Sequence, residues 1–161
     1  MVWFFQRAAR AIGRERELDH LRAFDYGSRA FNGAVDEFWL NGDLTISPHE
    51  QAAFLKRMFR YELPIDRRHV DAVEAALTMP RGQVSNAAGV HDFALAWPGA
   101  IARLKTGNGT VNGERVSWLV GEIESGRRAY VFASRVRSSA RALETTAGAD
   151  AALRVLNGMT P

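Results

Sequence analysis

Hydrophobic positions follow a helical period in the first half of the chain. Apolar residues at helical spacing predict one helix from Val2 to about Ile12 and a second from Arg14 to about Phe24. Residues 25–46 lack such a period and are punctuated by glycine, so we expect a loop that carries an aromatic cluster. In the run 47–50, Ser-Pro-His-Glu, a serine that can cap stands three residues before a glutamate, with proline between them. This capping box predicts the start of a third helix.

Two helices are predicted between residues 47 and 80, and an irregular segment follows them. Asp66 can cap the second of these helices, and residues 80–99 contain too many prolines and glycines for a regular element. The buried stripe of the first helix would consist of Phe54, Leu55, Met58 and Phe59. The apolar face of the second would consist of Val70, Val73 and Leu77.

After residue 100 the pattern changes to short apolar runs that are typical of strands. Strands are predicted at Ile101 to Thr106, Val116 to Glu124 and Ala129 to Val136, and Ser125-Gly126 is a suitable turn between the last two. Strands joined in this way are antiparallel. A short helix from Ala149 to Leu156 would then pack on the sheet. The predicted fold class is α+β, with helices, a three-stranded antiparallel sheet and a C-terminal helix.

Composition restricts the classes of function. The chain has 161 residues, 47% apolar and 24% charged, which is typical of a single globular domain over residues 1–161. The absence of cysteine excludes disulfides, cysteine-based zinc sites and a cysteine nucleophile. The four histidines are scattered, so we expect no metal site. The net charge of +3 is spread along the chain, so we expect no nucleic-acid partner, and no apolar run is long enough to cross a membrane.

Lys105, Thr106 and Gly107 form the first candidate for chemistry. They end a predicted strand, and we expect the next two residues, Asn108-Gly109, to form a turn. A lysine ammonium there offers a cation to a carboxylate, threonine offers a hydroxyl donor, and glycine lets a ligand lie close to the strand. The alternative interpretation of three such common residues is a strand end with a solvated lysine.

A second candidate is the order of short motifs along the chain. Tyr26-Gly27 is followed by Ser28, then by the pair Phe38-Trp39, and then by Lys105-Thr106-Gly107. This order resembles the class D serine β-lactamases and the related penicillin-sensing domains, which carry Ser-x-x-Lys, Ser-x-Val, Tyr-Gly-Asn, a Phe-Trp pair and Lys-Thr-Gly. Ser28 replaces the asparagine of the third motif. The resemblance covers nearly the whole chain and implies the C-terminal part of the β-lactamase/transpeptidase-like fold.

Two departures from the family pattern concern the nucleophile. No Ser-x-x-Lys occurs upstream of Tyr26, and Met1-Val2-Trp3 looks like the end of the Ser-x-Val motif. The resemblance therefore implies an N-terminally truncated domain, with the nucleophilic serine and the carbamylated lysine of the family absent. We expect no nucleophile in this chain. The family takes up CO2 or bicarbonate on that absent lysine, so no cofactor is expected here.

The resemblance also implies roles for individual residues. The indole N–H of Trp39 would hold the carbamate, and Lys105 would supply positive potential near the substrate carboxylate. Thr106 would donate to that carboxylate, and the backbone N–H of Asn108 would lie near the oxyanion hole. The family grips the carboxylate with an arginine beyond its last strand. The other positions that match substrate-binding segments are Val2, Tyr26, Gly27 and Leu40, with Arg137 and Arg141 as candidates for the arginine.

The resemblance thus implies β-lactam antibiotics such as penicillins as partners and the periplasm as location. The intact protein would hydrolyse the β-lactam ring through an acyl-enzyme, whereas this chain alone would be inactive. Two alternatives are a penicillin-sensing domain that holds the adduct and a non-catalytic remnant. No signal-peptide pattern opens the sequence, because the charges follow the first apolar residues. The strand at Ala129 to Val136 would have one open edge, which predicts self-association.

Overall fold

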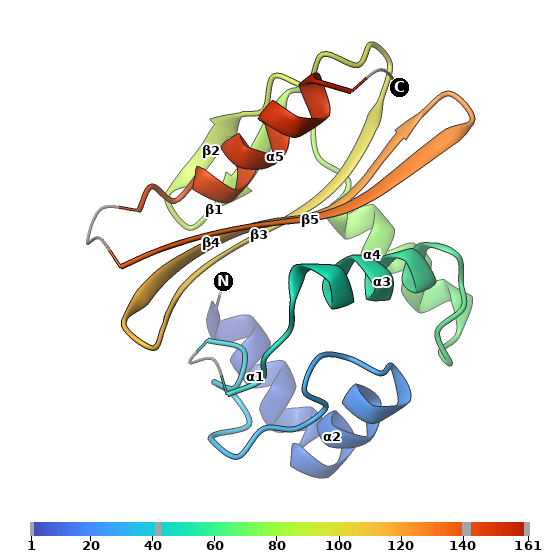
Figure 1. The fold of residues 1–161 in the computed structure, drawn as a ribbon. Helices are drawn as coiled ribbons and strands as arrows, with labels where there is room; N and C mark the ends of the chain where they lie inside the picture. Colours follow the sequence, from blue (N-terminus) through green and yellow to red (C-terminus); the bar gives the residue numbers. More distant parts are fainter. Residues whose placement is uncertain (1, 41–42, 140–142, 160–161) are drawn as a thin grey trace.

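The described part of the chain contains five helices and five strands, which form three layers. The computed structural model describes residues 2–40, 43–139 and 143–159. The helices are α1 (Val2–Ile12), α2 (Arg14–Ala23), α3 (Pro48–Phe59), α4 (Arg67–Leu77) and α5 (Ala147–Asn157). The strands are β1 (Gln83–Asn86), β2 (Gly89–Asp92), β3 (Ile101–Val111), β4 (Glu114–Ser125) and β5 (Arg128–Ser138). An antiparallel sheet of order β3-β4-β5 lies between α5 with the β1-β2 hairpin on one face and α1–α4 on the other (Figure 1). The predicted α+β class is confirmed.

Local capping sets the starts of α3 and α4. The Ser47 hydroxyl accepts from the Glu50 amide at 3.2 Å, and the Glu50 carboxylate accepts from the Ser47 amide at 2.8 Å, so the predicted capping box is formed. Asp66 accepts from the amide of Arg68 at the start of α4. Val70 is buried there as predicted, but Val73 is 42% exposed, so its assignment to the buried face is wrong. The residue that α4 directs to the sheet is instead Glu74, through an ion pair with β3.

The strands extend further than the apolar runs indicated. Asn108 and Gly109 lie within β3, paired with Ser117 and Val116 of β4, so the predicted turn at these residues is wrong. The chain reverses instead at 112–113, an Asn-Gly pair with φ values of 52° and 79°. These positive φ values match the two-residue hairpin turns that Asn-Gly favours. Hydrogen bonding to β4, rather than hydrophobicity, therefore extends β3 over its polar second half.

The prediction that residues 80–99 are irregular is wrong in part. They contain the β1-β2 hairpin, whose strands have only four residues each. The side-chain oxygen of Asn86 accepts from the amide of Ala88 at 2.8 Å and so stabilises the connection between the strands. Val84 of β1 is buried against the face of the sheet that carries α5. Strands this short leave little periodicity in the sequence, and packing on the sheet determines them.

Two apolar clusters lie on the two faces of the sheet. Leu104, Leu119 and Ile123 are completely buried against α5, together with Ala152 and Leu156 of that helix. The opposite face packs against α3 and α4, and a third cluster joins α2 to the aromatic loop. The cluster at α3 and α4 is formed by Leu55, Met58 and Val70, against which Val120 and Val131 of the sheet pack. The cluster between α2 and the aromatic loop is formed by Leu21, Phe31 and Phe38.

The outer edge of β5 and the apolar start of α1 lack a covering partner among the described residues. Among the described strands, β5 pairs only with β4, so its outer edge is open, as the predicted open edge requires. In α1, the exposed fractions of Val2, Trp3, Phe4 and Phe5 are 48%, 65%, 55% and 49%. None of the described helices has the length and hydropathy that a membrane crossing requires.

Candidate functional site

Lys105 lies in β3 on the face of the sheet that packs against α3 and α4. The residues on either side of it, Leu104 and Thr106, point to the other face: Leu104 joins the core under α5, and the Thr106 hydroxyl donates to the Ser85 carbonyl at 2.6 Å. Because side chains alternate along a strand, Lys105 points toward the helical layer. Its cross-strand neighbour Val120 packs against α3 and α4, which confirms the direction.

The Lys105 ammonium has no acidic partner among the described residues. It donates to the carbonyl of Thr106, which is a neutral acceptor. Although the residue as a whole is exposed, burial of the ammonium lowers the pKa of Lys105 below its usual value. A desolvated cation without a counter-ion attracts an anion, so this position is suited to a carboxylate ligand.

The structure separates Thr106 and Asn108 from Lys105. Thr106 is 9% exposed and its hydroxyl is engaged by β1, on the face of the sheet that carries α5. Asn108 has the same orientation as Thr106, because two residues separate them along the strand, and it is exposed. Gly107 lies on the same face of the sheet as Lys105. A Cβ added at Gly107 would lie 3.6 Å from the Cβ of Trp118.

The segment Tyr26–Ser28 forms a tight loop against residue 45. Gly27 has a φ of 52°, and a Cβ on it would lie 2.2 Å from the Thr45 carbonyl oxygen, so glycine is required there. The Ser28 amide donates to that carbonyl at 2.8 Å, and the Ser28 hydroxyl accepts from the Thr45 amide at 3.2 Å. Ser28, at the position where the family motif has asparagine, therefore fastens this loop.

Tyr26 anchors the same loop to α3. Its hydroxyl donates to the side-chain oxygen of Gln51 at 2.7 Å, and its ring packs edge-on against Phe54 with 4.7 Å between the centroids. Burial raises the pKa of Tyr26, so the phenol stays protonated and continues to donate. The Tyr-Gly loop and the start of α3 are thereby held together.

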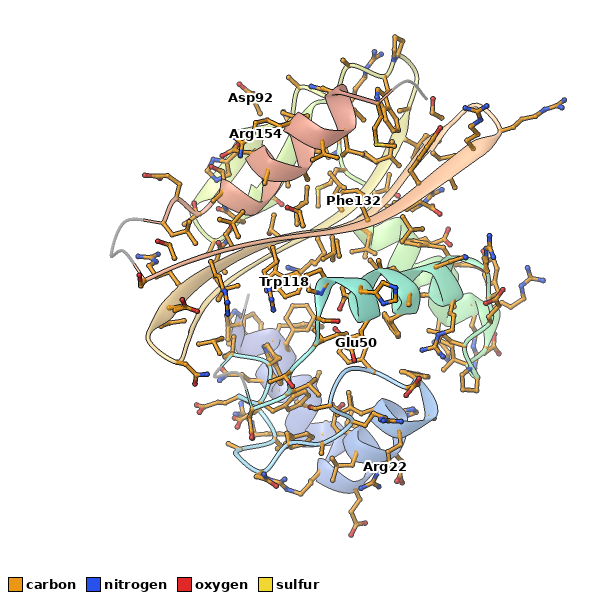
Figure 2. All side chains as sticks on the ribbon, viewed as in Figure 1. Arg22, Glu50, Asp92, Trp118, Phe132 and Arg154 are labelled. Carbon is orange, nitrogen blue, oxygen red and sulfur yellow. The ribbon has the colours of Figure 1, made fainter. Side chains whose placement is uncertain are left out.

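A cavity of about 350 Å³ lies where this loop, the start of α3 and β5 meet. Arg135 is the residue of β5 that lines this cavity. Its guanidinium carbon lies 5.2 Å from the centroid of the Trp118 ring. Figure 2 shows Trp118 on the side of the sheet that faces the helical layer. The sequence did not distinguish Arg135 from the other arginines of this stretch, and Arg137 and Arg141 were the predicted candidates. Strand pairing places Arg135 in one row with Trp118 and Gly107, and therefore on the face of the sheet that carries Lys105. The residues that line the cavity are Gly27, Ser28, Thr45, Ile46, Ser47, Glu50 and Arg135.

The remaining predicted substrate-binding residues are more scattered. Arg137 is largely exposed and pairs with Glu114 at 3.4 Å, so its guanidinium already has a carboxylate partner. Arg141 lies outside the described residues. Val2 stands at the exposed start of α1. Arg137 is therefore engaged by a carboxylate of this chain rather than free to bind a ligand.

The Phe-Trp segment lies against the second half of β3. Phe38 is 7% exposed and stacks on Phe31 at 4.2 Å, and Trp39 meets Phe38 edge-on at 4.9 Å. Among the described residues the Trp39 indole N–H has no hydrogen-bond partner. The Leu40 carbonyl oxygen lies 3.7 Å from where a Cβ on Gly109 would stand. Folding thus brings the Phe-Trp segment next to the strand that carries Lys-Thr-Gly.

Comparison with known proteins identifies the family of this chain. Residues 1–157 match the penicillin binding protein transpeptidase domain. A probable β-lactamase of Bacillus subtilis, YbxI, is 32% identical over 86% of this chain and 46% of its own length. The regulatory protein BlaR1 of Bacillus licheniformis is 29% identical over 97% of this chain and 23% of its own length. The crystal structure of the class D β-lactamase YbXI from Nostoc has a TM-score of 0.75 at 30% identity, covering 96% of this chain and 58% of that one. The chain thus spans less than half the length of these curated relatives.

Proposed function

Because the chain belongs to the penicillin binding protein transpeptidase domain family, with class D β-lactamases among its relatives, we propose that it is the β-lactam-recognising C-terminal part of a class D serine β-lactamase-like protein. The observation that carries this proposal is the Lys105 ammonium, which is partly buried, lacks an acidic partner among the described residues and shares its face of the sheet with Arg135. Penicillins carry a carboxylate beside the reactive ring, and such a cation would bind it.

The remaining residues would complete the recognition of the substrate. Lys105 and Arg135 would attract the carboxylate, with Gly107 leaving room for the ligand beside β3. The Trp39 indole N–H, without a partner among the described residues, would hold the carbamate of the catalytic lysine. Thr106 would donate to the ligand only after its hydroxyl leaves the Ser85 carbonyl.

In the intact protein we infer acyl transfer followed by hydrolysis. A serine oxygen supplied by the rest of the domain would bond to the β-lactam carbonyl carbon, the ring C–N bond would break, and the nitrogen would take up a proton. Water would then cleave the ester, release the opened acid and restore the serine hydroxyl. Backbone N–H groups near Asn108 would stabilise the oxyanion. We place this protein in the periplasm, where its β-lactam substrates arrive.

Binding to this chain tests the recognition step. Equilibrium dialysis with labelled benzylpenicillin is expected to show binding that Lys105→Ala weakens about tenfold or more, as expected when a charge-assisted contact is removed. Lys56 is the only other lysine, and it is exposed on α3, so Lys56→Ala is the matched control and should bind as the parent chain does. Equal affinities of the two variants would exclude Lys105 from recognition.

Catalysis requires a separate measurement. The chain should not hydrolyse a chromogenic cephalosporin, because it contains no Ser-x-x-Lys ahead of Tyr26. In a protein that includes the serine, Lys105→Ala should lower kcat/KM by about two to three orders of magnitude. Saturable turnover by the 161-residue chain, or unchanged kinetics in the longer variant, would contradict the assignment.

A penicillin-sensing domain is the second candidate. The observation that favours it is coverage, since the match to BlaR1 includes 97% of this chain against 86% for the YbxI β-lactamase of Bacillus subtilis. A sensor would be acylated once and keep the adduct, whereas a β-lactamase would release it. The lifetime of the acylated protein, followed by mass spectrometry on a version that includes the serine, distinguishes the two.

A further inference from the structure

Three carboxylates lie on the same side of the sheet as Lys105, and none of them is paired with it. Glu122 and Glu124 of β4 and Glu74 of α4 gather on the face of the sheet that Lys105 shares. Glu122 is the cross-strand partner of Arg103, and Lys105 is the next residue of β3 on that face, so Glu122 is its diagonal neighbour. Diagonal neighbours in an antiparallel pair are within reach of long side chains.

Arg103 occupies all three carboxylates. Its guanidinium lies 2.9 Å from the Glu122 carboxylate, 3.1 Å from Glu124 and 3.7 Å from Glu74. The side chains of Arg103 and Glu122 are 17% and 11% exposed, so this pair is shielded from water. Glu74 is 21% exposed and Glu124 is 43% exposed, so the network opens to solvent at Glu124. One positive charge against three negative charges leaves the cluster with a formal charge of −2.

Removal of Arg103 would leave a formal charge of −3 beside a lysine that has no counter-ion. Burial raises the pKa of Glu122, and the charges of Glu74 and Glu124 raise it further, while Arg103 lowers it. A buried carboxylate without a cation is costly, so Glu122 would take the next cation within reach. That cation is Lys105.

We propose that Arg103 is a positioning residue that keeps the Lys105 ammonium available by occupying Glu74, Glu122 and Glu124. The consequence for β-lactam recognition rests on the proposed function, whereas the choice of ion-pair partner does not. A lysine captured by Glu122 would have to break a buried ion pair before it could bind a substrate carboxylate.

The two lysines of the chain provide the measurement. Acetylation with a limiting reagent, followed by peptide mass spectrometry, gives the separate reaction rates of Lys105 and Lys56. Only the neutral amine reacts, and an opposite charge at contact raises the pKa of an amine by about one unit or more. Arg103→Met should therefore slow acetylation of Lys105 about tenfold or more and leave the rate of Lys56 unchanged.

Two controls identify the cause. The double variant Arg103→Met with Glu122→Gln should restore the Lys105 rate to within about twofold of the parent, because the capturing carboxylate is gone. Arg127→Met removes the same charge from the exposed β4-β5 turn and should change neither rate. An unchanged Lys105 rate in Arg103→Met, or slow labelling that persists in the double variant, would overturn the proposal.

A single variant keeps the proposal testable if Arg103→Met does not fold. Glu122→Gln alone should leave the Lys105 rate as in the parent, because Lys105 does not pair with Glu122 while Arg103 is present. A tenfold faster rate in this variant would mean that Lys105 and Glu122 are already paired in solution, and the proposal would be wrong. Failed penicillin binding alongside the expected acetylation rates would refute the proposed function and leave the role of Arg103 intact.

Discussion

The loop around Gly27 provides a stability test whose size follows from the structure. In Gly27→Ala, the new methyl group would start 2.2 Å from the Thr45 carbonyl oxygen, and the backbone has a φ of 52°. The positive φ costs an alanine about 1 kcal/mol relative to glycine. Relief of the overlap moves residue 45 and breaks two hydrogen bonds between Ser28 and Thr45, each contributing about 0.5–1.5 kcal/mol. The expected loss is about 2–4 kcal/mol.

Gly82→Ala is the matched control. Gly82 also has a positive φ, 75°, but nothing lies within 4 Å of its added Cβ, so this variant contains the backbone cost without the overlap. Urea unfolding followed by far-ultraviolet circular dichroism, at several protein concentrations, gives the free energy of unfolding of both variants. Gly27→Ala should be less stable than Gly82→Ala by about 1–3 kcal/mol. Equal stabilities would refute the argument that contact with Thr45 requires glycine at position 27.

Three further predictions concern the last helix, the ligand and the sheet edge. Gly148→Ala should destabilise the protein by about 1–3 kcal/mol, because its Cβ would lie 2.7 Å from the β4 backbone, whereas Gly158→Ala at the end of α5 should be neutral within about 1 kcal/mol in urea unfolding. Carboxylate binding by Lys105 requires the protonated ammonium, so affinity should fall as pH rises through a pKa below 10.5, and a fall that persists in Lys105→Ala would contradict this. Self-association through the open β5 edge should give species heavier than 17.8 kDa in sedimentation velocity as concentration rises, and a single 17.8 kDa species throughout would contradict it.

Local structure that depends on residues close together in the chain was predictable from the sequence. The capping box at Ser47 and the cap at Asp66 depend on hydrogen bonds between residues at most three positions apart, so the sequence indicated the starts of α3 and α4. The apolar runs of β4 and β5 likewise predicted the sheet. The order of motifs pointed to the family without any geometry, because motif identity depends on residue type and spacing alone.

Residue type and spacing were therefore enough to predict the local elements, their α+β order and the family. The continuation of β3 through Asn108 and Gly109 depends on the folded chain, since its partners in β4 come later in the sequence. The folded chain also decided that Thr106 turns to Ser85, that Arg135 shares a face with Lys105, and that Arg103 occupies the neighbouring carboxylates. These relations depend on strand register and on which face is covered, and a shift of one residue in pairing would reverse every side chain.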